Sequence, residues 1–119
     1  MRMWMVEPRY MCDKHLLGEH VECHMFTGQL KRKRNIDGYI ENGLLEPGSL
    51  KSRHDELAGE MTKRGFKHRS PLKNFGVGYL PEKQQKFRVD SESSHKELKK
   101  RCVRCRKRKD KSEALNSKF

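Results

Sequence analysis

A group of four residues near the start of the chain consists of three titratable side chains followed by an aromatic one, and its spacing suits acid–base chemistry. The group recurs at i, i+4, i+7 and i+11 and consists of His15, Glu19, Glu22 and Phe26. On an α-helix this spacing forms one narrow stripe. Two carboxylates beside an imidazole can take up and release a proton during a reaction, so the stripe predicts a general acid or base. A solvated polar face would have the same pattern, and the spacing alone does not separate the two interpretations.

A second group has the residue types of a metal site. Cys102-Val-Arg-Cys105 has the spacing of half a zinc site, and two more ligands would be needed to complete it. The candidates for the second half are His20 and His24, which are one turn apart on a helix face, with Cys12 and Cys23 as reserves. A structural zinc ion is therefore one interpretation. The other is that Cys102 and Cys105 simply continue an apolar helix stripe that begins at Leu98.

The acidic stripe requires a helix, and Asp13 is a suitable N-cap for it because its carboxylate faces the positive end of the helix dipole. We expect this helix to end between Phe26 and Leu30, close to Gly28. Its packing face is predicted to lie roughly opposite the acidic stripe. That face would contain Leu17, His20, Val21 and His24.

Two further helices complete the expected fold. The second has Ser49 as N-cap and Gly65 just beyond its end, and its apolar stripe is Leu50, His54, Leu57 and Met61. The third should run from Ser94, whose spacing to Glu97 is that of a capping box, to about Arg108. The sequence thus predicts a small all-α, three-helix single domain with irregular loops. We expect residues 1–80 to form the helical core and residues 81–119 a basic C-terminal helix and tail.

The composition points to a polyanionic partner. The 119 residues include 28 basic and 16 acidic ones, which gives a net charge of +12. Neutralising phosphates releases condensed counterions, so this excess favours nucleic acid, with an anionic membrane surface as the rival. No transmembrane or signal segment is recognisable, and we expect a monomeric protein in a reducing cytoplasm, where the cysteines stay free.

The basic residues gather at helix ends, where they suit both the helix dipole and a phosphate backbone. The predicted DNA contacts are Arg2, Lys31, Arg32, Lys33, Arg34, Lys63, Arg64, Lys99, Lys100, Arg101 and Arg104. A solvated cationic tail is the simpler interpretation of the last four.

Three segments together resemble a known family. They are Met1-Arg2, the run Asp-Lys-His-Leu-Leu-Gly-Glu-His-Val-Glu from Asp13, and the run Leu-Ala-Gly-Glu-Met-Thr-Lys-Arg-Gly-Phe from Leu57. They resemble the phage pyrimidine-dimer DNA glycosylases of the endonuclease V type over roughly the first seventy residues. In that family the nucleophile is the amine of the first residue, an arginine follows it, and the catalytic acid is a glutamate on the first long helix.

The resemblance implies specific roles. An alignment without a gap puts the amine on Met1, the arginine on Arg2 and the catalytic glutamate on Glu22, with His15 and Glu19 beside it. The family's best-known member has arginines at the positions of Val21 and Met25. Methionine is normally removed only before a small residue, so Met1 should be retained ahead of Arg2.

The implied function is excision of a damaged base from duplex DNA, in the host cytoplasm if a phage encodes the chain. An α-amine, with an ordinary pKa of about 7.7–8.0, is nearer to a neutral nucleophile than lysine at about 10.4. Its attack on the sugar would give an imine and then strand cleavage by β-elimination, without a cofactor. The alternatives are a non-catalytic DNA-binding protein with the same fold and a zinc-stapled nucleic-acid module.

Overall fold

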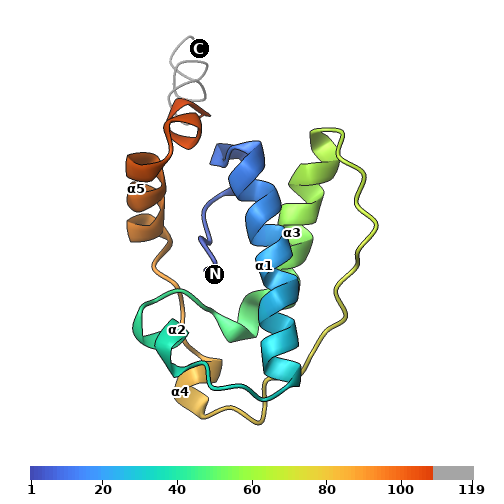
Figure 1. Ribbon diagram of the computed structural model, residues 1–119, viewed down its shortest axis with the longest axis vertical. Helices are drawn as coiled ribbons and strands as arrows, with labels where there is room; N and C mark the ends of the chain where they lie inside the picture. The colour runs from blue at the N-terminus through green and yellow to red at the C-terminus, as the bar shows by residue number, and fades with distance from the viewer. Residues whose placement is uncertain (109–119) are drawn as a thin grey trace.

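The computed structural model describes residues 1–108, and its regular elements are all helical (Figure 1). The all-α fold predicted from the sequence is confirmed. In chain order the elements are a 3-10 turn (Pro8–Tyr10), α1 (Asp13–Lys31), α2 (Asp37–Glu41), a 3-10 turn (Pro47–Ser49), α3 (Leu50–Lys63), α4 (Glu82–Gln85) and α5 (Ser91–Arg101). Among residues 1–108, no helix has both the length and the apolar character that crossing a bilayer requires. The end of the predicted tail lies beyond the described residues.

The long helix α1 forms where the sequence predicts it, but a different face is buried. Cys12 is its N-cap, and Asp13 is its first residue, where the carboxylate still meets the positive end of the dipole. The buried face consists of Leu16, Glu19, His20, Cys23, Phe26, Thr27 and Leu30. The predicted packing face was therefore wrong except at His20. Val21 is 53% exposed, and Leu17 is only partly buried.

Helix α3 packs against α1, with the stripe predicted from the sequence facing inward. Leu50, His54, Leu57 and Met61 are all buried. After the helix, Gly65 has a φ of +89°, a conformation that residues with a Cβ rarely adopt. The second predicted helix is thus confirmed together with the residue that ends it.

The third long helix, α5, begins earlier than predicted. Asp90 is its N-cap, and the carboxylate accepts hydrogen bonds from the backbone N–H groups of Glu92 and Ser93. The predicted capping box at Ser94 is wrong, because Ser94 lies inside the helix and is buried. The helix ends at Arg101, the backbone of the C-cap residue Cys102 is extended, and residues 103–108 are helical again.

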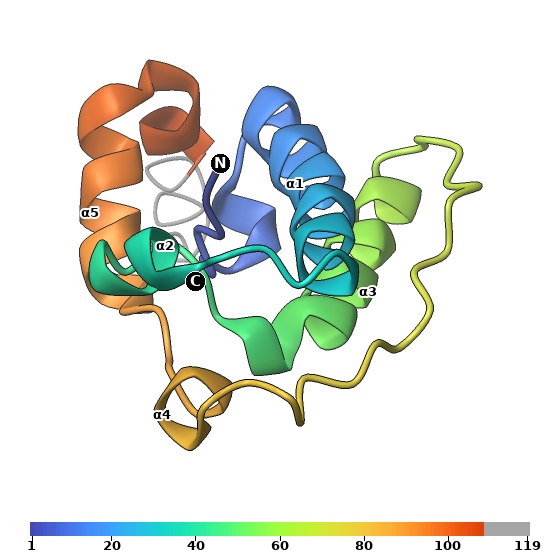
Figure 2. The ribbon, with the colours of Figure 1, turned by 60° about the horizontal axis from the view of Figure 1, so that its bottom comes forward.

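The short helices α2 and α4 were not predicted, because the stretches around them contain mainly turn residues. Tyr39 on α2 packs edge-on against Phe26 of α1, with ring centroids 5.0 Å apart. A long irregular segment, residues 66–81, connects α3 to α4 along the outer side of α3 (Figures 1 and 2).

Candidate active site and metal cluster

The N-terminal segment lies between α1 and α5, with the chain end in the middle of the molecule (Figures 1 and 2). The Met3 N–H donates a 2.7 Å hydrogen bond to the Leu44 carbonyl, and Met3, Trp4 and Val6 are buried. Met5 has a φ of 55°, in the left-handed region that residues other than glycine rarely occupy. The segment is therefore bent and packed into the core rather than extended into solvent.

Arg2 joins this segment to α5. Its guanidinium donates to Glu97 at 3.1 Å and to Ser94 at 3.2 Å, and it lies 3.7 Å from the centre of the Trp4 ring. The side chain is 16% exposed. The salt bridge and the ring thus engage the Arg2 cation within the protein, and its DNA contact stays a prediction.

Glu22 lies close to the chain end. Its pKa is raised mainly because burial disfavours the charged carboxylate. Two groups of the N-terminal segment act in the opposite direction and lower the pKa: the backbone N–H of Arg2 donates to the carboxylate, and the positive charge of the amino terminus lies within electrostatic range. The amino terminus and the glutamate selected from the sequence therefore lie within electrostatic range of each other.

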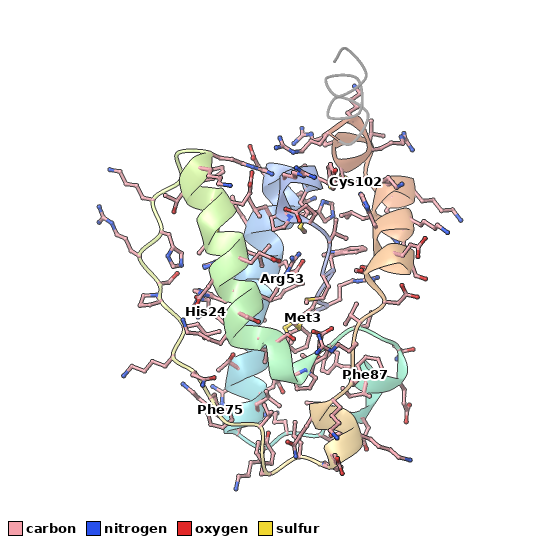
Figure 3. All side chains as sticks on the ribbon, turned by 180° about the vertical axis from the view of Figure 1, so that it is seen from behind. Met3, His24, Arg53, Phe75, Phe87 and Cys102 are labelled. Carbon is pink, nitrogen blue, oxygen red and sulfur yellow. The ribbon has the colours of Figure 1, made fainter. Side chains whose placement is uncertain are left out.

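Glu19, by contrast, is buried in a salt bridge. Arg53 of α3, which is labelled in Figure 3, donates to both of its carboxylate oxygens, at 2.6 Å and 2.9 Å. Arg53 also donates to Glu56. The charge of Glu19 is therefore compensated inside the protein, and its predicted place beside Glu22 in the catalytic group stays a prediction. Sequence reasoning missed Arg53, because nothing within α3 itself signals a partner 34 positions earlier.

His15 lies in a cluster with three sulfur atoms. Its Nδ1 is 3.2 Å from the Cys12 sulfur and 3.6 Å from the Cys105 sulfur, and the Cys12 and Cys102 sulfurs are 3.8 Å apart. All four ligand atoms lie within 4.8 Å of one another, so the cluster could hold a metal ion. Its position, beside the start of α1, is seen at Cys102 in Figure 3.

This arrangement corrects the predicted ligand set, in which His20 and His24 completed the site. Both histidines lie further along α1, in a separate cluster with His54 and His68. The His20 and His68 Nε2 atoms are 2.9 Å apart, and His24 and His54 both contact the Ser70 carbonyl. His20, His54 and His68 form a second group whose nitrogens could share a metal ion. The spacing Cys12-x-x-His15 was the missed signal, because it matches that of Cys102-x-x-Cys105.

The predicted DNA contacts divide into exposed and engaged cations. Arg64 is engaged: its guanidinium binds Asp13, Glu60 and the carbonyls of Pro8 and Met11. Lys99 is partly buried. The exposed ones are Lys31, Arg32, Lys33, Arg34, Lys63, Lys100, Arg101 and Arg104, and of these Arg101 also forms a salt bridge with Glu97. Most of them lie toward the two ends of the long axis, with the chain end between (Figure 1).

Comparisons with known proteins identify the family. Residues 1–74 match the family model described as pyrimidine dimer DNA glycosylase. Searches of curated proteins and of solved structures gave no significant match. The matched residues include the N-terminal segment, all of α1 with Glu22, and all of α3. Because the match covers more than half of the 119 residues, the chain belongs to the pyrimidine dimer DNA glycosylase family.

Proposed function

We propose that the protein is a DNA repair N-glycosylase with AP lyase activity that acts on damaged duplex DNA, with pyrimidine dimers as the expected lesion. The proposed nucleophile is the α-amine of Met1, and Glu22 is the proposed acid–base group. The reaction uses only groups of the chain itself and needs no cofactor.

The observation that carries this proposal is the juxtaposition of the amino terminus and Glu22. The carboxylate is half-buried and receives the Arg2 N–H, and the charge of the amine, within electrostatic range, lowers the carboxylate pKa. A carboxylate in this position can stabilise positive charge on the sugar and can also exchange protons with it. The match to the family model over residues 1–74 supports the same assignment.

The proposed reaction has two stages. Attack of the amine nitrogen on C1′ breaks the C1′–N bond to the base, and the base leaves as it takes up a proton. Opening of the sugar ring gives an imine between the nitrogen and C1′. Glu22 then accepts the C2′ proton, and the electron pair of that C–H bond expels the 3′ phosphate, which breaks the strand.

The exposed cations support binding to a duplex. Lys31–Arg34 lie toward one end of the long axis, and the cations at and just after the end of α5 lie toward the other (Figure 1). The molecule extends 49 Å along this axis. A duplex lying along it would be held at both ends by phosphate contacts, with the amine near the middle. Because C1′ is hidden in a straight duplex, we expect the DNA to be bent or a nucleotide to be flipped out.

The other proposal is a non-catalytic DNA-binding protein, which the basic surface would serve equally well. Borohydride reduction in the presence of duplexes that are ultraviolet-damaged, abasic or intact separates the two. An imine-forming enzyme is trapped covalently on damaged and abasic DNA, whereas a simple binder is not. The control is a variant with a short extension ahead of Met1, which displaces the amine. If the unmodified protein binds damaged DNA but is never trapped, the catalytic proposal is wrong.

A further inference from the structure

We propose that Cys12, His15, Cys102 and Cys105 bind one zinc ion, which joins the end of α5 to the start of α1. The four ligand atoms come from two segments about ninety positions apart, and they converge to within 4.8 Å of one another. The proposal concerns how the fold is held together and does not depend on the reaction proposed above.

Two of the distances between ligand atoms match those of a tetrahedral zinc site, and a third is shorter. With Zn–S bonds of about 2.3 Å and Zn–N bonds of about 2.0–2.1 Å, two ligand sulfurs should be about 3.8 Å apart and a sulfur and a nitrogen about 3.6 Å apart. The Cys12 and Cys102 sulfurs are 3.8 Å apart, and the His15 nitrogen is 3.2 Å and 3.6 Å from the sulfurs of Cys12 and Cys105. A disulfide, which needs sulfurs about 2.05 Å apart, does not fit this arrangement.

Both ligand pairs lie at the end of a long helix. Each pair has two residues between its ligands. Cys12 is the N-cap of α1, with His15 in the first turn, and Cys102 is the extended C-cap residue that follows α5. The Cys12 N–H donates to the Cys105 sulfur at 3.2 Å. Hydrogen bonds of this kind stabilise the negative charge of a thiolate and orient it toward a metal.

Charge and location also favour zinc. Three thiolates and a neutral imidazole around Zn²⁺ carry one net negative charge, and the exposed cations Arg104 and Arg106 are beside the cysteines in sequence. Thiolate and imidazole ligands suit zinc better than magnesium or calcium. A small protein buries few apolar residues, and such proteins are often stabilised by a structural metal ion. Here it would fix α5 beside the N-terminal segment.

Zinc analysis and cobalt substitution of the full-length protein test this inference. We expect one zinc per chain after purification and a loss of at least tenfold in zinc content in Cys105→Ser. The matched control is Cys23→Ser, since Cys23 is also buried and free but lies outside the cluster. We expect Cys23→Ser to retain its zinc.

The spectrum of bound cobalt identifies the ligands in the unmodified protein, without replacing any residue. This matters if Cys105→Ser fails to fold. Tetrahedral cobalt bound by three thiolates gives intense visible bands and a sulfur-to-metal charge-transfer band. We expect one equivalent of Co²⁺ to produce them and zinc to abolish them. Metal binding with no sulfur charge transfer, which would point to the group of His20, His54 and His68, would overturn the proposal, as would the absence of binding.

Discussion

The guanidinium of Arg53 binds both carboxylate oxygens of Glu19 in the interior, where neither side chain is more than 1% exposed. The pair joins α3 to α1 one turn away from Glu22. Each charge depends on the other, because water is excluded from both and an unpaired buried charge is costly.

Removing one member of this pair should therefore destabilise the protein strongly. We expect Glu19→Ala to lower the free energy of unfolding by about 3–5 kcal/mol, measured by urea denaturation. The control is Glu82→Ala, which removes an exposed salt bridge to Lys86 and should cost at most about 1 kcal/mol. Replacing Glu19 by Leu together with Arg53 by Met should cost less than Glu19→Ala alone. If Glu19→Ala and Glu82→Ala lowered the free energy of unfolding equally, the buried salt bridge between Glu19 and Arg53 would not have this structural role.

The same pair shows where sequence reasoning reached its limit. Helices α1 and α3 could be predicted because their length and periodicity are strong signals. The buried face of α1 could not, because it includes a glutamate whose partner is 34 positions away, while the apolar Val21 and Met25 are about half exposed. Exposure of the last two depends on what packs against the helix, which no local pattern reports.

The candidate site shows the same division. The proximity of Glu22 to the first residue was predicted from the resemblance to the family. The partners of Cys102 and Cys105 were chosen from histidines one turn apart, although the pair Cys12 and His15 had the matching spacing. Choosing between two helix faces requires knowing which one α5 meets, and that is a property of the tertiary fold.

The histidine cluster should make stability depend on pH in the acid range. Burial, with the neighbouring imidazoles of His54, His68 and His24, lowers the pKa of His20 to about 4. The unfolded state takes up a proton near pH 6.5 and the folded state only near 4, so the free energy of unfolding should fall as the pH drops between these values.

A His20→Gln variant checks this cause, since it cannot titrate there. Asp55, which bonds to His54, and the other histidines stay in place. Urea denaturation at several pH values, with a chelator present, should show that the free energy of unfolding falls less at acid pH in the variant than in the unmodified protein. If the free energy of unfolding changed with pH in the same way in both proteins, His20 would not be the cause of the pH dependence.

Glu22 should make stability depend on pH in the opposite direction to His20. Because burial raises its pKa in the folded state, the folded protein keeps that proton to a higher pH than the unfolded chain. The stabilising contribution of the protonated Glu22 side chain is therefore present at low pH and is lost as the pH rises through the pKa of Glu22 in the folded protein. We expect Glu22→Gln to be modestly more stable than the unmodified protein at pH 7, with the difference vanishing near pH 4. A variant that is less stable at pH 7 would show that the carboxylate is there for structural reasons.

Two adjacent basic residues should separate DNA binding from stability. Lys63 is exposed, whereas Arg64 binds Asp13, Glu60 and two backbone carbonyls. We expect Lys63→Ala to weaken binding to duplex DNA at low salt and to reduce the slope of log affinity against log salt by about 1, with unchanged stability. Arg64→Ala should instead destabilise the fold by about 2 kcal/mol or more, because several partners are left unpaired. Binding titrations at several salt concentrations, together with thermal unfolding, check both.

The central claim is that the first nitrogen of the chain is the nucleophile, and mass spectrometry of the borohydride-trapped complex tests it most directly. After nuclease and protease digestion, we predict that the DNA remnant is attached to the α-nitrogen of a peptide that begins at Met1. Glu22→Gln should give at least a hundredfold less of this product while still binding DNA. A remnant attached to a lysine side chain, or a mature chain that begins elsewhere and is trapped equally well, would contradict the account.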